Sequence, residues 1–133
     1  MVALVPTSTA NGSAALVILL VEDEVMIRWS IAEALREAGY TVVEAGSGEE
    51  AIAISASDVS VDLLFTDINL LGLATGWDVA ESFRARHPEV SVLYTSGQRI
   101  DLERNVDRSE FLAKPYHPGN AVSACQRLCK KDH

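Results

Sequence analysis

A small set of polar residues in this sequence has the side chains that phosphoryl chemistry requires, namely Glu22, Asp23, Asp67, Ser96 and Lys114. An aspartate can attack a phosphoryl group and hold it as an acyl phosphate. Clustered carboxylates repel one another, so they are stable at neutral pH only beside a cation or a lysine. Mg2+ suits such a cluster because it takes oxygen ligands and leaves room for phosphate oxygens. An ammonium group and a hydroxyl would hold the remaining phosphate oxygens.

These residues can act together only if the fold brings them to one place, and the hydrophobic pattern indicates how. Short apolar runs alternate with amphipathic segments along the chain, which is typical of strands that alternate with helices. The expected strands are Leu16–Val21, Thr41–Ala45, Val61–Thr66, Val90–Thr95 and Phe111–Ala113. The expected helices are Glu24–Ala38, Ser47–Ile54, Trp77–Arg86 and Asn120–Lys130.

The expected strands are too apolar to be exposed on either face, which predicts a parallel sheet covered by helices on both sides. In such sheets, ligands bind outside the carboxyl ends of the strands. The five candidate residues all follow expected strands directly: Glu22 and Asp23 the first, Asp67 the third, Ser96 the fourth and Lys114 the fifth. We therefore expect them to converge at one edge of the sheet.

Four short segments in this order resemble the signatures of the receiver domain of bacterial two-component systems. They are Val21–Glu24, Thr66–Asn69, Tyr94–Gly97 and Ala113–Tyr116, and the resemblance spans roughly residues 16–129. It implies an α/β, flavodoxin-like, doubly wound parallel sheet of five strands in the order 2-1-3-4-5. It also implies that a histidine kinase or a histidine phosphotransfer protein phosphorylates Asp67 in the presence of Mg2+.

The resemblance also gives roles to single residues. Glu22, Asp23 and Asp67 match the acids of the metal site, and Asn69 matches the residue that lends a backbone carbonyl to the metal. Lys114 matches the lysine that contacts the phosphate and precedes a proline, Pro115, whose peptide bond is often cis. Ser96 matches the switch hydroxyl, although Thr95 beside it is also a hydroxyl. Phe111 matches the switch aromatic residue, and Asn69 and Gln98 match positions that tune the loss of phosphate.

Two segments depart from the family pattern. Leu71 stands where the family usually has proline, and residues 72–76 make the loop after Asp67 longer than usual. The stretch between Ser96 and Lys114 is shorter than the family norm by about one helical turn. We therefore expect the fourth helix to be short or irregular.

Other functions remain open at this stage. The chain could be a receiver-like interaction module that docks on its partner without phosphorylation. A phosphatase of the haloacid dehalogenase type also uses an aspartate, a lysine and a hydroxyl on a parallel sheet, but its nucleophile follows the first strand. Trp29 could be packed against the fold or could contact a partner. As a receiver, the chain would be no enzyme beyond Mg2+-dependent self-phosphorylation and autodephosphorylation.

Composition limits the remaining classes. The 133 residues suffice for one domain, which we place at residues 15–133 behind a flexible leader at residues 1–14. The net charge of -8 argues against binding to nucleic acid or to a membrane surface. Cys125 and Cys129 lie one helical turn apart, which favours reduced thiols and a cytoplasmic location. The output would pass through an unknown downstream protein, with the chain a monomer or a weak dimer.

Overall fold

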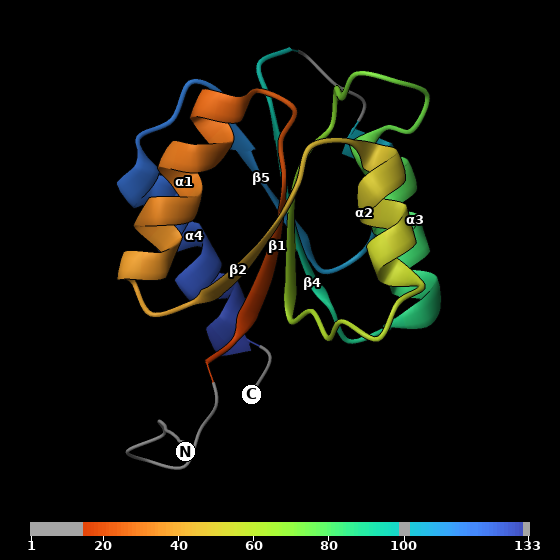
Figure 1. Cartoon of the computed structure of the whole chain (residues 1–133), viewed down its shortest axis with the longest axis horizontal. Coiled ribbons are helices and arrows are strands. Elements are labelled where there is room, and N and C mark those ends of the chain that lie inside the picture. Colours follow the sequence, from red (N-terminus) through yellow and green to blue (C-terminus); the bar gives the residue numbers. More distant parts are fainter. Residues whose placement is uncertain (1–14, 99–101, 132–133) are drawn as a thin grey trace.

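The computed structural model describes residues 15–98 and 102–131, which form one parallel sheet with helices on both faces (Figure 1). The proposed leader, residues 1–14, lies outside the described residues. Along the chain, the elements are β1 (Val17–Val21), α1 (Val25–Glu37), β2 (Thr41–Ala45), α2 (Gly48–Ser55), β3 (Leu63–Asp67), α3 (Gly76–Arg86), β4 (Ser91–Ser96), the 3-10 turn η2 (Leu102–Arg104), β5 (Ser109–Ala113) and α4 (Pro118–Lys131).

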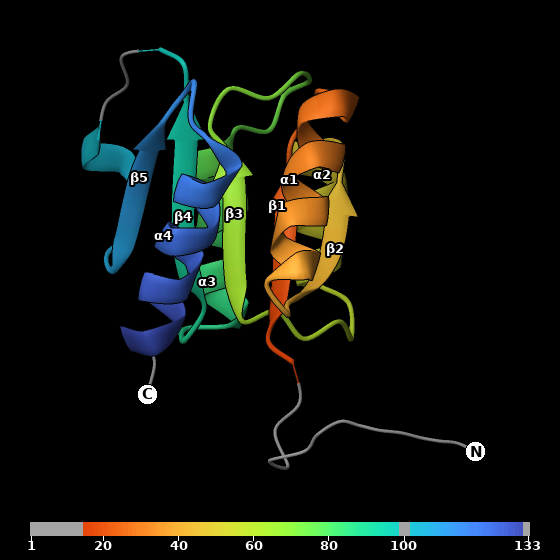
Figure 2. The same cartoon turned by 90° about the vertical axis from the view of Figure 1, so that its left-hand side faces the viewer.

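The sheet has the order β2-β1-β3-β4-β5, and every neighbouring pair is parallel, as predicted. Helices α1 and α4 cover one face, and α2 and α3 cover the other (Figures 1 and 2). Each strand divides its side chains between two cores because successive residues point to opposite faces. In β1, Ile18 and Leu20 belong to the core beneath α1 and α4, whereas Leu19 and Val21 belong to the core beneath α2 and α3.

Side-chain caps set the starts of two of the helices, α2 and α3. The hydroxyl of Ser47 accepts a hydrogen bond from the backbone N–H of Glu50 and so begins α2, as the sequence predicts. Thr75 and Asp78 form a reciprocal capping box at the start of α3. Within the described ranges, no helix is long and apolar enough to cross a lipid bilayer.

The starts of four strands shift by one or two residues from the predicted ones, and the carboxyl ends of two strands also differ. Asp67 and Ser96 are the last residues of β3 and β4 rather than the first residues after them. The reason is backbone pairing, since Asp67 remains in register with Thr95 and Ser96 with Ala113. Both residues nevertheless lie at the carboxyl edge of the sheet, where the hydrophobic pattern places them.

The predicted irregularity between β4 and β5 is confirmed. The described residues of this segment contain the short turn η2 in place of a full helix, and residues 99–101 lie outside the description. Contacts with α3 hold the turn: the indole N–H of Trp77 donates to Asn105 Oδ1 over 2.8 Å, and the Arg104 guanidinium lies 5.0 Å from the centre of the Trp77 ring. The backbone N–H of Val106 donates to the hydroxyl of Tyr94 in β4.

Candidate functional site

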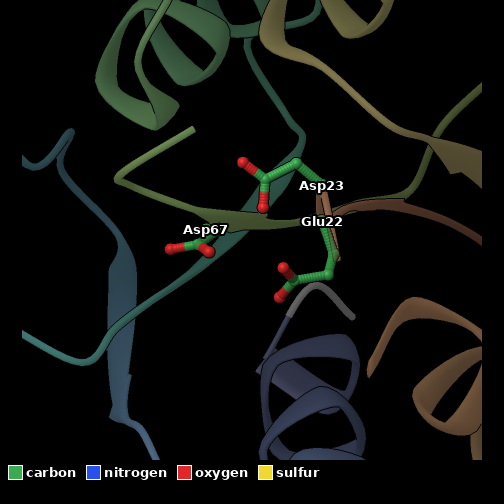
Figure 3. Close-up of side chains that lie close together, drawn as sticks. All are labelled: Glu22, Asp23 and Asp67. Carbon is green, nitrogen blue, oxygen red and sulfur yellow. The ribbon is translucent and has the colours of Figure 1, made fainter. Parts of the chain in front are cut away.

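The carboxyl edge of the sheet gathers three acids from two strands. Glu22 and Asp23 follow β1, and Asp67 ends β3, so the order of the sheet makes them neighbours. One carboxylate oxygen from each lies within 4.8 Å of the others. Figure 3 shows the three carboxyl groups around a common space. Glu22 and Asp67 are buried, with 2% and 5% of their surface exposed, which is unusual for charged residues without partners.

Lys114 is the partner of the two buried acids. Its Nζ lies 2.9 Å from Glu22 Oε1 and 2.9 Å from Asp67 Oδ2. The lysine follows β5 directly, and the Lys114–Pro115 peptide bond is cis, as the resemblance implies. The sequence therefore identified four residues that the structure brings together, namely Glu22, Asp23, Asp67 and Lys114.

The electrostatics follow from this burial. Loss of solvent raises the pKa of both Glu22 and Asp67 above the ordinary carboxyl range, and the contacts with Lys114 oppose that rise. Burial alone would lower the pKa of Lys114, but the two carboxylates raise it above the usual lysine value. Lys114 is therefore a cation at neutral pH. One lysine does not balance three carboxylates, and the site retains an excess of negative charge.

The donor set fits a hard divalent cation. Three carboxylate oxygens lie close enough to share one ion, and an ion with two positive charges would cancel the excess negative charge. Asp23 is only half-buried, so solvent reaches the site and can complete the coordination shell. Mg2+ prefers oxygen ligands and retains several waters, which is the coordination that this arrangement allows.

The two hydroxyls at the end of β4 have different surroundings. Ser96 Oγ accepts a hydrogen bond from Asn69 Nδ2 over 2.9 Å and one from the backbone N–H of Gln98 over 3.1 Å. Thr95 pairs in register with Asp67, so its side chain lies on the same face of the sheet as the Asp67 carboxylate. Its buried Oγ1 has no hydrogen-bond partner within the described part of the chain. Residue types alone gave no sign of this unpaired group.

Phe111 does not join the site. It lies in β5, at the edge of the sheet, and 36% of its surface is exposed. Its register partner is Tyr94, on the face opposite Asp67. Its assignment as a switch residue stays a prediction, as does that of Ser96.

Three features near Asp67 were not predicted from the sequence. The backbone N–H of Leu71 donates to Asp23 Oδ2 over 2.8 Å. Glu49, at the start of α2, accepts hydrogen bonds from two backbone N–H groups of the same loop. Gly76, the first residue of α3, lies so close to the backbone of Asp67 that a side chain would not fit there. In the sequence, the only signal for the contact between Gly76 and the backbone of Asp67 was the glycine itself, directly before Trp77 at the start of the expected helix.

Comparison with known proteins agrees with this geometry. The profile of the response regulator receiver domain matches residues 18–126. The chain is 30% identical over 125 residues to the transcriptional regulatory protein PdtaR of Mycobacterium tuberculosis, covering 91% of this chain and 60% of that protein. It is 32% identical over 126 residues to the sensor kinase CckA of Brucella abortus, covering 91% of this chain and 13% of that protein. The chain thus spans less than two thirds of these relatives.

Solved structures give the same result. A response regulator receiver protein from Sinorhizobium medicae is 30% identical, with a TM-score of 0.84 over 90% of this chain and 98% of that one. The chemotaxis protein CheY4 of Vibrio cholerae is 25% identical, with a TM-score of 0.76 over 86% of this chain and 99% of that one. With its matching profile, fold and relatives, this chain belongs to the response regulator receiver domain family.

Proposed function

We propose that this chain is a phosphoryl-accepting switch in which Asp67 receives the phosphoryl group from a phosphohistidine of a histidine kinase or a phosphotransfer protein. The contact between Asp67 and Lys114 carries the proposal, because it places a carboxylate nucleophile beside a cation that can hold a phosphate oxygen. The acids beside it supply the ligands that a divalent cation needs.

In the transfer, an oxygen of the Asp67 carboxylate forms a bond to phosphorus. The bond between phosphorus and the histidine nitrogen breaks, and the imidazole leaves with the electron pair. Glu22, Asp23, Asp67 and the backbone carbonyl of Asn69 would hold Mg2+, which supplies charge neutralisation for the phosphate oxygens when it is bound. Lys114 would leave Asp67 Oδ2 for a phosphate oxygen, and the Ser96 hydroxyl would donate to another.

The partner surface that we propose lies beside this site. A groove of about 420 Å³ runs between α1 and the start of α4 and is lined by residues that include Met26, Ile31, Lys114 and Tyr116. Met26 and Trp29 of α1 are 73% and 59% exposed, so Trp29 is available to a partner rather than packed in the core. Large apolar side chains that are exposed beside a groove mark contact surfaces in many proteins.

The output would pass through protein contacts or onward phosphotransfer, with the chain acting in the cytoplasm as a monomer or a weak dimer. We propose no turnover of an external substrate, only Mg2+-dependent self-phosphorylation and autodephosphorylation. Ser96 and Phe111 would report the phosphorylated state at the surface around β4, the turn η2 and α4. Asn69 already contacts Ser96, so loss of phosphate and the position of the switch hydroxyl would depend on the same amide.

A phosphotransfer assay tests this function. The protein is incubated with Mg2+ and a labelled small phosphodonor, and Asp67→Asn is compared with the exposed Asp58→Asn. We expect label on the wild-type protein and on Asp58→Asn but none on Asp67→Asn. Retention of label by Asp67→Asn would overturn the assignment. Sustained release of phosphate from a phosphoester would instead indicate a phosphatase, and partner binding that is unchanged by phosphorylation would indicate a constitutive interaction module.

A further inference from the structure

The loop that follows Asp67 is tied to two carboxylates that come from other elements. The backbone N–H of Leu71 donates to Asp23 Oδ2 over 2.8 Å. The backbone N–H groups of Leu73 and Ala74 donate to Glu49 Oε2 over 3.0 and 3.2 Å. We call residues 71–74 the latch loop. One end of the latch loop is thus fixed to an acid of the candidate metal site, and the other end is fixed to the first turn of α2.

These hydrogen bonds, rather than the packing of its two leucines, hold the latch loop. Leu71 and Leu73 are 76% and 95% exposed, so neither leucine contributes much buried surface. Gly72 has a φ of +97°, a conformation that few other residues adopt, and it forms the turn between the two tethers. The Glu49 carboxylate accepts hydrogen bonds from the backbone N–H groups of Glu49, Leu73 and Ala74, and these keep the pKa of Glu49 below its ordinary value. Glu49 is therefore an ionised acceptor at neutral pH.

The hydrogen bond from the Leu71 N–H restrains the carboxylate of Asp23. Asp23 is half-buried beside two like charges, Glu22 and Asp67, which repel its carboxylate toward solvent. The Leu71 N–H engages Oδ2 of Asp23 and so restricts the orientation of the carboxylate that contributes one oxygen to the cluster with Glu22 and Asp67. A proline at position 71, which the family pattern leads us to expect, has no N–H and could not make this contact.

We infer that the latch loop orients Asp23 for Mg2+, and that Glu49 is a positioning residue for the metal site although it does not itself reach the metal. Glu49 fixes residues 73 and 74, the loop fixes the Leu71 N–H, and that N–H fixes the Asp23 carboxylate. The inference rests on the metal site of the proposed function but requires no phosphoryl transfer. Coupling between sites is reciprocal, so Mg2+ must also stabilise the latch loop.

Calorimetric titration of the protein with MgCl2, without any phosphodonor, tests the inference. Removing a group that directly orients a metal ligand typically lowers metal affinity about 10- to 100-fold. Glu49 acts on the ligand Asp23 only through the latch loop, so we expect a smaller effect: Glu49→Ala should weaken Mg2+ binding about 3- to 10-fold. Glu50→Ala is the matched control, because it removes the same charge from the same turn of α2 but its carboxylate binds Gly46 N–H instead of the latch loop. Glu49→Gln keeps an oxygen acceptor and should restore part of the affinity.

Amide hydrogen exchange of the same variants gives a readout that a loss of charge alone would not change. In the wild-type protein and in Glu50→Ala, Mg2+ should slow exchange at Leu71, Leu73 and Ala74, and in Glu49→Ala this protection should be lost. Equal Mg2+ affinities for Glu49→Ala and Glu50→Ala would overturn the inference. So would loop amides that exchange at the same rate with and without Mg2+. Because no phosphoryl group is present, these outcomes are distinct from a failure of Asp67 to accept phosphate.

Discussion

The contact between Gly76 and the acceptor backbone allows a prediction whose size follows from the structure. A Cβ atom on Gly76 would overlap the carbonyl oxygen of Asp67 and would lie 2.8 Å from Cα of Ile68. Ordinary contacts between such atoms are about 3.5 Å, so Gly76→Ala requires a displacement of about 1 Å. The obstructing atoms are backbone on both sides, which cannot move away by rotating a side chain.

Overpacking of this kind costs about 1–3 kcal/mol. The shift would also weaken the hydrogen bond from Gly76 N–H to Ile68 O, at 2.9 Å, which contributes about 1 kcal/mol. Alanine favours a helix over glycine by at most about 1 kcal/mol, which offsets only part of this cost. We therefore expect Gly76→Ala to lower the free energy of unfolding by about 1–3 kcal/mol and to slow phosphorylation, because the backbone of Asp67 is displaced.

Urea unfolding followed by circular dichroism measures this loss. Gly97→Ala is the control, since a Cβ there would meet Lys114 Cβ at 3.7 Å, an ordinary contact, and should change stability by less than about 0.5 kcal/mol. If Gly76→Ala were as stable as Gly97→Ala, the close approach of α3 to the acceptor would be refuted.

Four further variants test the electrostatics of the site and the packing around the site and the turn η2. Asp67→Asn should raise the free energy of unfolding at neutral pH, because burial raises the pKa of Asp67 and makes its ionised form unfavourable in the fold. The gain in stability should vanish as the pH falls below 3.8, the ordinary pKa of an aspartate, because Asp67 is then protonated in both the folded and the unfolded protein. Urea unfolding measured at several pH values tests this, and a gain that did not change with pH would refute it. Thr95→Val should stabilise the protein by about 1 kcal/mol in the same assay, since it removes an unpaired buried hydroxyl. Asn105→Ala should cost about 1 kcal/mol, because it leaves the half-buried indole N–H of Trp77 without its acceptor. Arg104→Ala should cost less than Asn105→Ala, because the ion pairs of Arg104 are exposed and screened by solvent. The reverse order of the two losses would contradict this.

The fold was predictable because each element has a strong local signal. Runs such as Leu63–Phe65 are apolar on both faces of the sheet, which only a doubly covered strand satisfies. Boundaries were less predictable, because backbone pairing continues through Asp67 and Ser96, whose polar side chains suggest the end of a strand. The irregular segment before β5 was visible as a shortened stretch without helical periodicity.

The reactive residues of the site were more predictable than the contacts that hold them in position. Acids and a lysine at strand ends point to one edge of a parallel sheet, and the structure places Glu22, Asp67 and Lys114 in contact there. The tether from Leu71 to Asp23 was not predictable, because it uses a backbone N–H that every residue except proline has. The environment of Thr95 depends on the pairing register, which residue types do not specify.

The most direct test of the central claim is to find the modified residue. The protein is incubated with Mg2+ and a small phosphodonor and then treated with borohydride, which reduces an acyl phosphate on aspartate to the alcohol homoserine. Mass spectrometry of the peptides then locates the change. We predict homoserine at position 67 and at no other aspartate, with the modification lost when Mg2+ is removed by a chelator. An unmodified Asp67 together with homoserine at another aspartate would contradict the account.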